Sequence, residues 1–217
     1  MSEGQAAIEG FAALLMRLRA EGITNIALLK AVEATPRVDF VPAQFTDAVW
    51  SERTIPLDCG AFLEGADLCV KLLDLLDIKE GQRILEVGTG SGYLAAIMGR
   101  LCERVVSIDR YRTLTEAAHR RFSRLGLDNI VTRQADGRRG LAGEGTFDRI
   151  LVTAAFDAMP RQFVDHLVSD GIMLAPIMQD DGSVVLARLT KIGSRFERED
   201  LFEVPYLPLV AGQAAVL

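Results

Sequence analysis

Residues 85–93 read Leu-Glu-Val-Gly-Thr-Gly-Ser-Gly-Tyr, and they join a predicted strand at 83–87 to a predicted helix at 91–101. Gly88 permits a tight turn, Gly90 lets a ligand approach the backbone, and Gly92 lets the helix start close to the sheet. A glycine-rich loop between a strand and a helix is typical of sites that bind nucleotide-like molecules. Because the pattern is common, a plain glycine turn without a ligand remains an alternative.

Strands and helices alternate along the chain after residue 65. The apolar pattern predicts strands at 83–87, 104–108, 130–133, 147–152 and 172–177, and helices at 66–76, 91–101, 113–125 and 160–167. This alternation predicts an α/β fold with a doubly wound, mainly parallel sheet and helices on both faces. Two further strands, at 184–189 and 196–204, flank a turn at Gly193 and predict a C-terminal antiparallel strand pair.

The first 65 residues follow a different pattern. Apolar residues at helical spacing predict an amphipathic helix that ends near Gly22, and a second, short helix begins at a cap, Thr24 or Asn25, and ends before Pro36. Residues 36–65 are irregular, and we expect a long loop region with short elements. No linker interrupts the chain, so we predict one domain over residues 1–217, made of N-terminal helices and a loop (1–76), a core (77–178), and C-terminal strands with a tail (179–217).

Composition and charge argue against several classes of protein. The chain of 217 residues is 49% hydrophobic and 25% charged, as ordinary globular proteins are. The net charge of -6, without a basic stripe, predicts no nucleic-acid partner. The 3 widely spaced cysteines and 2 histidines predict no metal site and indicate reduced thiols in the cytoplasm. No signal peptide or apolar stretch of membrane-spanning length is recognisable.

Three carboxylates lie at or near predicted strand ends. Asp109 ends the second strand, where an acidic residue accepts hydrogen bonds from ribose hydroxyls, although a helix N-cap is the alternative role. Asp136 follows the third strand and either accepts from an adenine amino group or serves only as a turn residue. Glu86 directly precedes the glycines and is suited to pair with a ligand's ammonium group, which S-adenosylmethionine has and NAD lacks. The alternative for Glu86 is a surface charge at a strand end.

Several segments carry a resemblance to a known family. Residues 84–93, 105–109, 136–137 and 147–155 resemble the ordered motifs of class I S-adenosylmethionine-dependent methyltransferases. Methyltransferases in general do not share the N-terminal segments 22–24 and 38–42 or the C-terminal segments 196–202 and 206–210. With these segments included, the chain resembles the protein-L-isoaspartate O-methyltransferase family. The resemblance implies a Rossmann-like methyltransferase sheet with an N-terminal helical extension.

The resemblance also implies an activity and a site. The enzyme would methylate the α-carboxylate of isoaspartyl residues in damaged peptides or proteins, and the methyl ester would promote succinimide formation and repair. S-adenosyl-L-methionine would be the cofactor, with no metal, no catalytic triad and a monomer or weak dimer. The residues implied for the cofactor are Glu86, Gly88, Thr89, Gly90, Asp109, Arg110, Asp136, Gly137 and Thr153. Those implied for the substrate are Ala154, Leu209 and Val210, with the loop Phe62, Leu63 and Glu64.

The loop departs from the pattern of the family. Phe62 stands where the family has threonine, and Glu64 stands where it has serine at the junction of cofactor and substrate. A glutamate there repels an anionic acceptor unless it points to solvent or pairs with an arginine. These departures leave open a diverged methyltransferase for another acceptor, or a cofactor-binding homologue without catalysis. A nicotinamide-dependent oxidoreductase is disfavoured because no Tyr-x-x-x-Lys pair is present, and Cys59 as a nucleophile lacks a nearby histidine.

Overall fold

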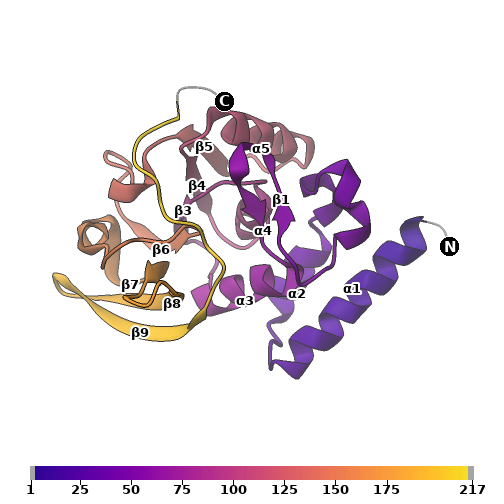
Figure 1. Cartoon of the computed structure of the whole chain (residues 1–217), viewed down its shortest axis with the longest axis horizontal. Helices are drawn as coiled ribbons and strands as arrows, with labels where there is room; N and C mark the ends of the chain where they lie inside the picture. Colours follow the sequence, from indigo (N-terminus) through magenta and orange to yellow (C-terminus); the bar gives the residue numbers. More distant parts are fainter. Residues whose placement is uncertain (1–2, 215–217) are drawn as a thin grey trace.

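A seven-stranded sheet lies at the centre of the protein in a computed structural model that describes residues 3–214 (Figure 1). The strand order is β5-β4-β3-β6-β7-β8-β9. These strands are β3 Arg83–Val87, β4 Arg104–Asp109, β5 Ile130–Gln134, β6 Phe147–Val152, β7 Leu167–Met178, β8 Val184–Ile192 and β9 Arg195–Glu203. Strands β3 to β7 pair in parallel, and β8 and β9 run antiparallel to their neighbours. The predicted α/β class, the mainly parallel sheet and the C-terminal antiparallel pair are confirmed.

The α-helices pack on one face of this sheet. Helices α3 Ala66–Leu76, α4 Tyr93–Gly99 and α5 Arg112–Arg124 share one apolar cluster with every second residue of the strands, such as Ile84 and Val105. The neighbouring strand residues, such as Leu85 and Val106, belong to a second cluster on the opposite face. Side chains of a strand point alternately to the two faces, so the continuous apolar runs of the sequence fill both layers.

The opposite face is covered by 3-10 helix and by the C-terminal segment. The helix predicted at 160–167 is a 3-10 helix, η5 Arg161–His166, which places Phe163 in the second cluster. Strand β7 begins at Leu167 and not at residue 172 as predicted, so the helical segment ends at His166. The Phe156 N–H donates to the Pro176 carbonyl of β7 at 2.9 Å, which binds the start of this segment to the sheet.

The N-terminal helices lie outside the sheet layer. Helix α1 Glu3–Ala20 and helix α2 Ile26–Glu33 both pack against α3, and Figure 1 shows α1 at the edge of the molecule. Asn25 is the cap of α2, since its side chain accepts a hydrogen bond from the Leu28 N–H at 3.1 Å. Within residues 3–214, no helix is both long and apolar enough to cross a membrane.

The irregular region between Pro36 and Gly65 contains only short elements, as expected. They are the 3-10 helices η1 Arg37–Phe40, η2 Ala43–Ala48 and η3 Asp58–Gly60, and the strands β1 Ile55–Pro56 and β2 Phe62–Leu63. Strands β1 and β2 form an antiparallel pair that is separate from the main sheet.

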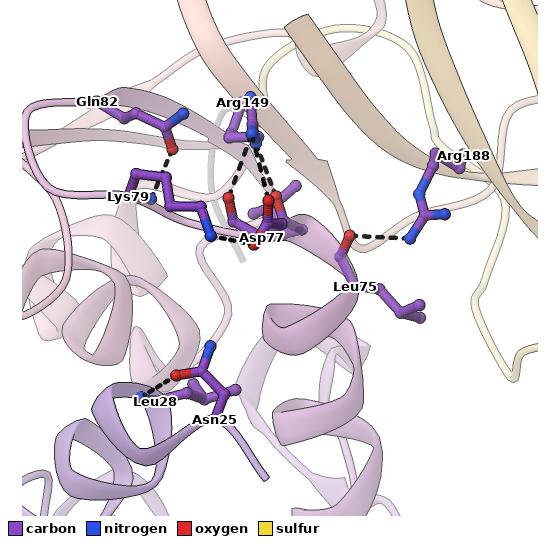
Figure 2. A network of polar contacts seen from close by, with 9 residues as sticks. Asn25, Leu28, Leu75, Asp77, Lys79, Gln82, Arg149 and Arg188 are labelled. Carbon is purple, nitrogen blue, oxygen red and sulfur yellow. Dashed lines mark hydrogen bonds and ion pairs between the residues drawn. The ribbon is translucent and has the colours of Figure 1, made fainter. Parts of the chain in front are cut away.

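Two arginines from the sheet bind the C-terminal end of α3 (Figure 2). Arg149 of β6 donates to the carbonyl groups of Leu76 at 2.7 Å and Asp77 at 3.2 Å, and Arg188 of β8 donates to that of Leu75 at 3.2 Å. The last carbonyls of a helix have no partner within the helix, and cations near this end also interact favourably with the helix dipole. These contacts therefore fix α3 against the sheet.

We expect the Arg149→Met variant to lose about 1–3 kcal/mol of the free energy of unfolding, because two carbonyls at a helix end lose their donor. Chemical denaturation measures this loss. The matched control is Lys79→Met, which removes an ion pair to Asp77 between side chains that are 62% and 52% exposed. Such an exposed pair contributes less than about 1 kcal/mol. Equal losses of unfolding free energy in Arg149→Met and Lys79→Met would show that Arg149 does not stabilise the C-terminal end of α3.

Candidate active site

A cavity of about 400 Å³ lies at the carboxyl ends of β3, β4 and β6. Its walls are formed by the loop at 59–64, the glycine loop at 87–91, the end of β4 with the start of α5 (108–111 and 114), residues 153–154, and the C-terminal segment 207–210. This is the size of a small-molecule site, and the crevice outside the carboxyl ends of the strands is where open α/β sheets bind their ligands.

The glycines of residues 88–92 have different reasons to be glycine. All three have positive φ angles, +104° at Gly88, +51° at Gly90 and +87° at Gly92. A Cβ at Gly88 would lie 2.2 Å from the hydroxyl oxygen of Thr153, and one at Gly92 would lie 2.8 Å from the ring of Phe122. At Gly90 the nearest atom would be 3.7 Å away, so a side chain there would occupy the cavity. Because Gly92 is not helical, α4 starts at Tyr93 and not at residue 91.

Asp109 holds the glycine loop and faces the cavity. Its carboxylate accepts from the N–H groups of Gly90 at 3.1 Å and Tyr111 at 3.0 Å. Burial raises the pKa of Asp109, and the backbone hydrogen bonds oppose this shift. Tyr111, and not Asp109, occupies the N-cap position of α5, so the alternative role as a helix cap is wrong. The arrangement leaves a carboxylate at the edge of the cavity to accept hydrogen bonds.

Glu86 lies behind the glycine loop and does not line the cavity. It is fully buried, so the alternative of a surface charge is wrong. One carboxyl oxygen accepts from the Ser107 hydroxyl, which lies 2.7 Å from the hydroxyl of Thr89, and the other oxygen has no hydrogen-bond partner among the described residues. Burial raises the pKa of Glu86 to about 8, with Glu64 and Asp109 adding to the shift. Glu86 thus reaches the cavity wall at Thr89 through two hydroxyl groups.

Asp136 does not line the cavity, and its side chain is partly exposed to solvent. Its carboxylate accepts from the N–H groups of Arg138 at 3.0 Å and Gly212 at 2.8 Å. Partial burial raises the pKa of Asp136, but these hydrogen bonds outweigh burial and the net pKa is lowered. Asp136 therefore acts as a turn residue that also binds the C-terminal segment. The next residue, Gly137, lines the cavity, and a Cβ there would lie 2.3 Å from Val87.

Glu64 points neither to solvent nor into an ion pair at hydrogen-bond distance. It lines the cavity, is 5% exposed, and accepts a hydrogen bond from the Tyr206 hydroxyl at 2.9 Å. The ring of Phe62 stacks on Tyr206 with centroids 5.9 Å apart. The buried guanidinium of Arg37 donates to the main-chain carbonyl of Glu64. Burial raises the pKa of Glu64, and the bond from Tyr206 and the charge of Arg37 lower it in part.

The C-terminal tail (residues 204–214) crosses the carboxyl ends of the strands, as the yellow segment of Figure 1 shows. Ala155, which follows β6, exchanges hydrogen bonds with Leu207 at 2.8 Å and Leu209 at 2.7 Å. Further along, the Ala214 N–H donates to the Arg110 carbonyl after β4 at 3.0 Å. The tail therefore forms a wall of the cavity, to which Leu209 and Val210 belong.

Most of the residues predicted from the sequence share this cavity. Those that line it are Phe62, Leu63, Glu64, Gly88, Thr89, Gly90, Asp109, Arg110, Gly137, Thr153, Ala154, Leu209 and Val210. Glu86 is buried behind the glycine loop, and Asp136 lies outside the lining with a partly exposed side chain. Cys59 lines it too, but burial raises the pKa of its thiol, which argues against a nucleophile. Among the described residues, no group of three or more His, Cys, Asp or Glu side chains is placed to hold a metal ion.

Sequence reasoning missed Arg37, Tyr206, Tyr111 and Leu114. Tyr111 and Leu114 line the cavity because α5 begins directly after Asp109. The signal available in the sequence was that both residues closely follow the carboxyl end of the predicted strand at 104–108. Arg37 and Tyr206 are partners of Glu64 that lie far from it in the chain, and no local pattern connects them.

Comparison with known proteins assigns the chain to a family. The family model described as protein-L-isoaspartate(D-aspartate) O-methyltransferase (PCMT) matches residues 10–214. A protein-L-isoaspartate O-methyltransferase of Rhizobium meliloti (strain 1021) is 57% identical over 94% of this chain and 100% of its own length. A protein of the same name from Azorhizobium caulinodans is 38% identical over 100% of both chains.

A solved structure shows the same fold. The protein-L-isoaspartate O-methyltransferase of Plasmodium falciparum, crystallised with S-adenosyl-L-homocysteine, matches with a TM-score of 0.80 and 23% identity, over 91% of this chain and 97% of that chain. Because the family model and these relatives cover almost the whole sequence, the chain belongs to the protein-L-isoaspartate(D-aspartate) O-methyltransferase family.

Proposed function

We propose that this protein is an S-adenosyl-L-methionine-dependent carboxyl O-methyltransferase that acts on isoaspartyl residues of peptides or proteins. The observation that carries the proposal is the cavity, in which the glycine loop, Asp109 and the tail meet at the carboxyl ends of the strands. The relative in Rhizobium meliloti is named for this activity, and the structure from Plasmodium falciparum contains the demethylated cofactor.

The residues present fit this cofactor. Asp109 presents a carboxylate to ribose hydroxyls, and Tyr111 and Leu114 supply an apolar wall beside it. Gly90 leaves open space where a Cβ would stand. The carboxyl group of Glu86, one oxygen of which has no partner among the described residues, lies behind the loop, and a ligand that carries an ammonium and a sulfonium would lower its raised pKa and favour its ionised form.

The chain's own contribution is positioning and exclusion of water. When bound, S-adenosyl-L-methionine supplies a methyl group on a positively charged sulfur. A carboxyl group with an ordinary pKa near 4 is ionised at neutral pH, so its oxygen attacks without a general base. Thr153 and Ala154 border the space beside the glycine loop, and Phe62 and Leu209 cover it. These walls hold the reacting groups in line, which is the main source of rate in such a transfer.

A second candidate, a methyltransferase for another acceptor, is favoured by the carboxyl group of Glu64 in the cavity wall. The two are separated by incubating the protein with labelled cofactor and an isoaspartyl peptide, an aspartyl peptide of the same sequence, or cell extract. We expect a methyl ester on the isoaspartyl peptide. Cofactor binding with label only on other molecules would support the second candidate, and binding without any transfer would indicate a non-catalytic homologue.

We also propose a location, a class of partners, a domain organisation and an oligomeric state for this protein. The three cysteines are free thiols, and this supports a reducing, cytoplasmic location. The partners are isoaspartyl peptides or proteins, without nucleic acid, and the acidic net charge of -6 supports this choice. The protein acts as one domain over residues 1–217 and as a monomer or weak dimer.

We expect Asp109→Asn to weaken cofactor binding about tenfold, because an amide presents N–H groups where two backbone N–H groups and the ribose hydroxyls need an acceptor. Titration calorimetry with S-adenosyl-L-homocysteine measures the change. Asp128→Asn, between α5 and β5, is a matched control that should bind as the wild type does. Unchanged affinity in Asp109→Asn would remove Asp109 from the cofactor site.

A further inference from the structure

The proposed reaction does not explain the carboxyl group of Glu64. A carboxylate acceptor needs no general base, and an ionised group beside it would repel it. Nevertheless Glu64 lines the cavity where the loop at 59–64 meets the tail. Cofactor held by the glycine loop and Asp109 would leave the acceptor the space between Thr153 and this wall.

Glu64 is held in this wall by a hydrogen bond to its side chain and by a contact to its main chain. The Tyr206 hydroxyl of the tail donates to its carboxyl group at 2.9 Å. Tyr206 is itself held by stacking on Phe62 of β2. Arg37 of η1 binds the main-chain carbonyl of Glu64, so the backbone is fixed as well. Turning Glu64 toward solvent would break the bond to a buried tyrosine, which is costly.

Ionisable groups surround Glu64 from every neighbouring element. Those that interact with it are Arg37 from η1, Cys69 from α3, Glu86 from β3 and Tyr206 from the tail, and Tyr93 of α4 lines the same cavity beside Arg37. Burial raises the pKa of Cys69 to about 12 and raises those of both tyrosines, so these three are neutral. Arg37 is stabilised by contacts to Val49, Cys69 and the main chain of Glu64. Since burial dominates, the pKa of Glu64 is raised and its carboxyl group keeps a proton to higher pH than usual.

We infer that Glu64 selects the acceptor by its charge. Protonated Glu64 admits a carboxylate acceptor to the cavity, and ionised Glu64 excludes one. The inference rests on the proposed function, because it takes the acceptor to be a carboxylate. The acceptor's own carboxyl group, with an ordinary pKa near 3.5, is ionised at all relevant pH values. Activity on it therefore falls as pH rises through the pKa of Glu64. Two like charges about 8 Å apart at an effective dielectric of about 20 change affinity roughly thirtyfold.

The test compares pH profiles of kcat/KM for an isoaspartyl peptide at saturating cofactor, from the ordinary pKa of a glutamate side chain, about 4.3, upward over the whole range in which the protein stays folded. Glu64→Gln keeps an acceptor for the Tyr206 hydroxyl but cannot ionise. We expect it to lose the alkaline fall and to exceed the wild type at least about tenfold at the highest pH. Tyr206→Phe keeps the ring on Phe62 but removes a hydrogen bond that lowers the pKa of Glu64, so its fall should move to higher pH.

Two controls make the comparison specific. Glu52→Gln removes an exposed carboxylate from the same region of the chain and should keep the wild-type profile. The pKa of Glu86 is about 8 and is raised in part by Glu64, so Glu64→Gln also shifts the titration of Glu86. Glu86→Gln, alone and combined with Glu64→Gln, separates the two groups, because the alkaline fall should persist in the single Glu86→Gln variant and disappear in the double variant.

Peptide binding separates failure of this inference from failure of the proposed function. Calorimetry with protein loaded with S-adenosyl-L-homocysteine measures peptide affinity without turnover. Identical pH profiles for wild type and Glu64→Gln, in turnover or in binding, would overturn the inference and leave the methyltransferase intact. If the isoaspartyl peptide neither binds nor is methylated in any variant while the cofactor binds, both the acceptor and the inference are wrong.

Discussion

Gly88→Ala is expected to lower the affinity for S-adenosyl-L-homocysteine at least about a hundredfold, or about 2.8 kcal/mol. Gly88 has a φ of +104°, which costs any other residue about 1–3 kcal/mol. The new methyl group would also lie 2.2 Å from the hydroxyl oxygen of Thr153, so the loop must move away from β6. When the glycine loop is displaced, its own backbone no longer lies between Asp109 and Thr153.

Gly81→Ala is the matched control for this effect. Gly81 also has a positive φ, +81°, but a Cβ there meets no atom within 4 Å and lies before β3, away from the cavity. It should lose stability from backbone strain and keep its cofactor affinity. Calorimetry measures the cofactor affinity of both variants, and thermal unfolding measures their stability. Together they distinguish backbone strain from displacement of the glycine loop.

The contact with Thr153 is tested by a double mutant. Thr153→Ala removes the oxygen that the new methyl group meets, so we expect it to restore part of the cofactor affinity lost in Gly88→Ala. Simple addition of the two losses would show that the contact is not the cause. Cofactor binding by Gly88→Ala with wild-type affinity would place the cofactor elsewhere.

Arg37→Met is expected to have the largest effect on stability, about 3–5 kcal/mol of the free energy of unfolding. Arg37 is fully buried, and its guanidinium donates to the carbonyl of Val49 at 2.7 Å, to the Cys69 sulfur at 3.2 Å and to the carbonyl of Glu64. It also lies 4.6 Å from the centre of the Tyr93 ring. Methionine fills much of the volume but removes the guanidinium donor of the Val49 carbonyl and leaves the Glu64 carbonyl with only the weak thiol donor of Cys69 at 3.7 Å.

Chemical denaturation measures this loss, with Arg53→Met as the control. Arg53 is exposed in the same region between α2 and α3, so its replacement should change stability by less than about 0.5 kcal/mol. Arg37→Met should also raise the pKa of Glu64 further, because the positive charge of Arg37 lowers it. A variant as stable as Arg53→Met would show that the buried guanidinium is not needed to hold the loop at 59–64.

Local patterns in the sequence were sufficient for the main architecture. The strand ends, the glycines after β3 and Asp109 after β4 follow from hydrophobic periodicity and from the backbone angles that only glycine adopts readily. The sequence also limited the N-cap of α2 to Thr24 or Asn25, because a capping hydrogen bond joins residues only a few positions apart in the chain. The end of the helical segment at His166 did not follow from a local pattern, because β7 begins at Leu167 through pairing with β6, which lies elsewhere in the chain.

The sequence by itself determined the α/β sheet through hydrophobic periodicity, and it determined the family and most residues that surround the cavity through its resemblance to known motifs. Only the tertiary structure decided the orientation of Glu64, which Tyr206 holds from 142 positions away. It also decided the burial of Glu86 and the bond from Asp136 to the C-terminal tail. Side-chain direction and burial depend on contacts between segments far apart in the chain, and no short stretch of sequence contains both partners of such a contact.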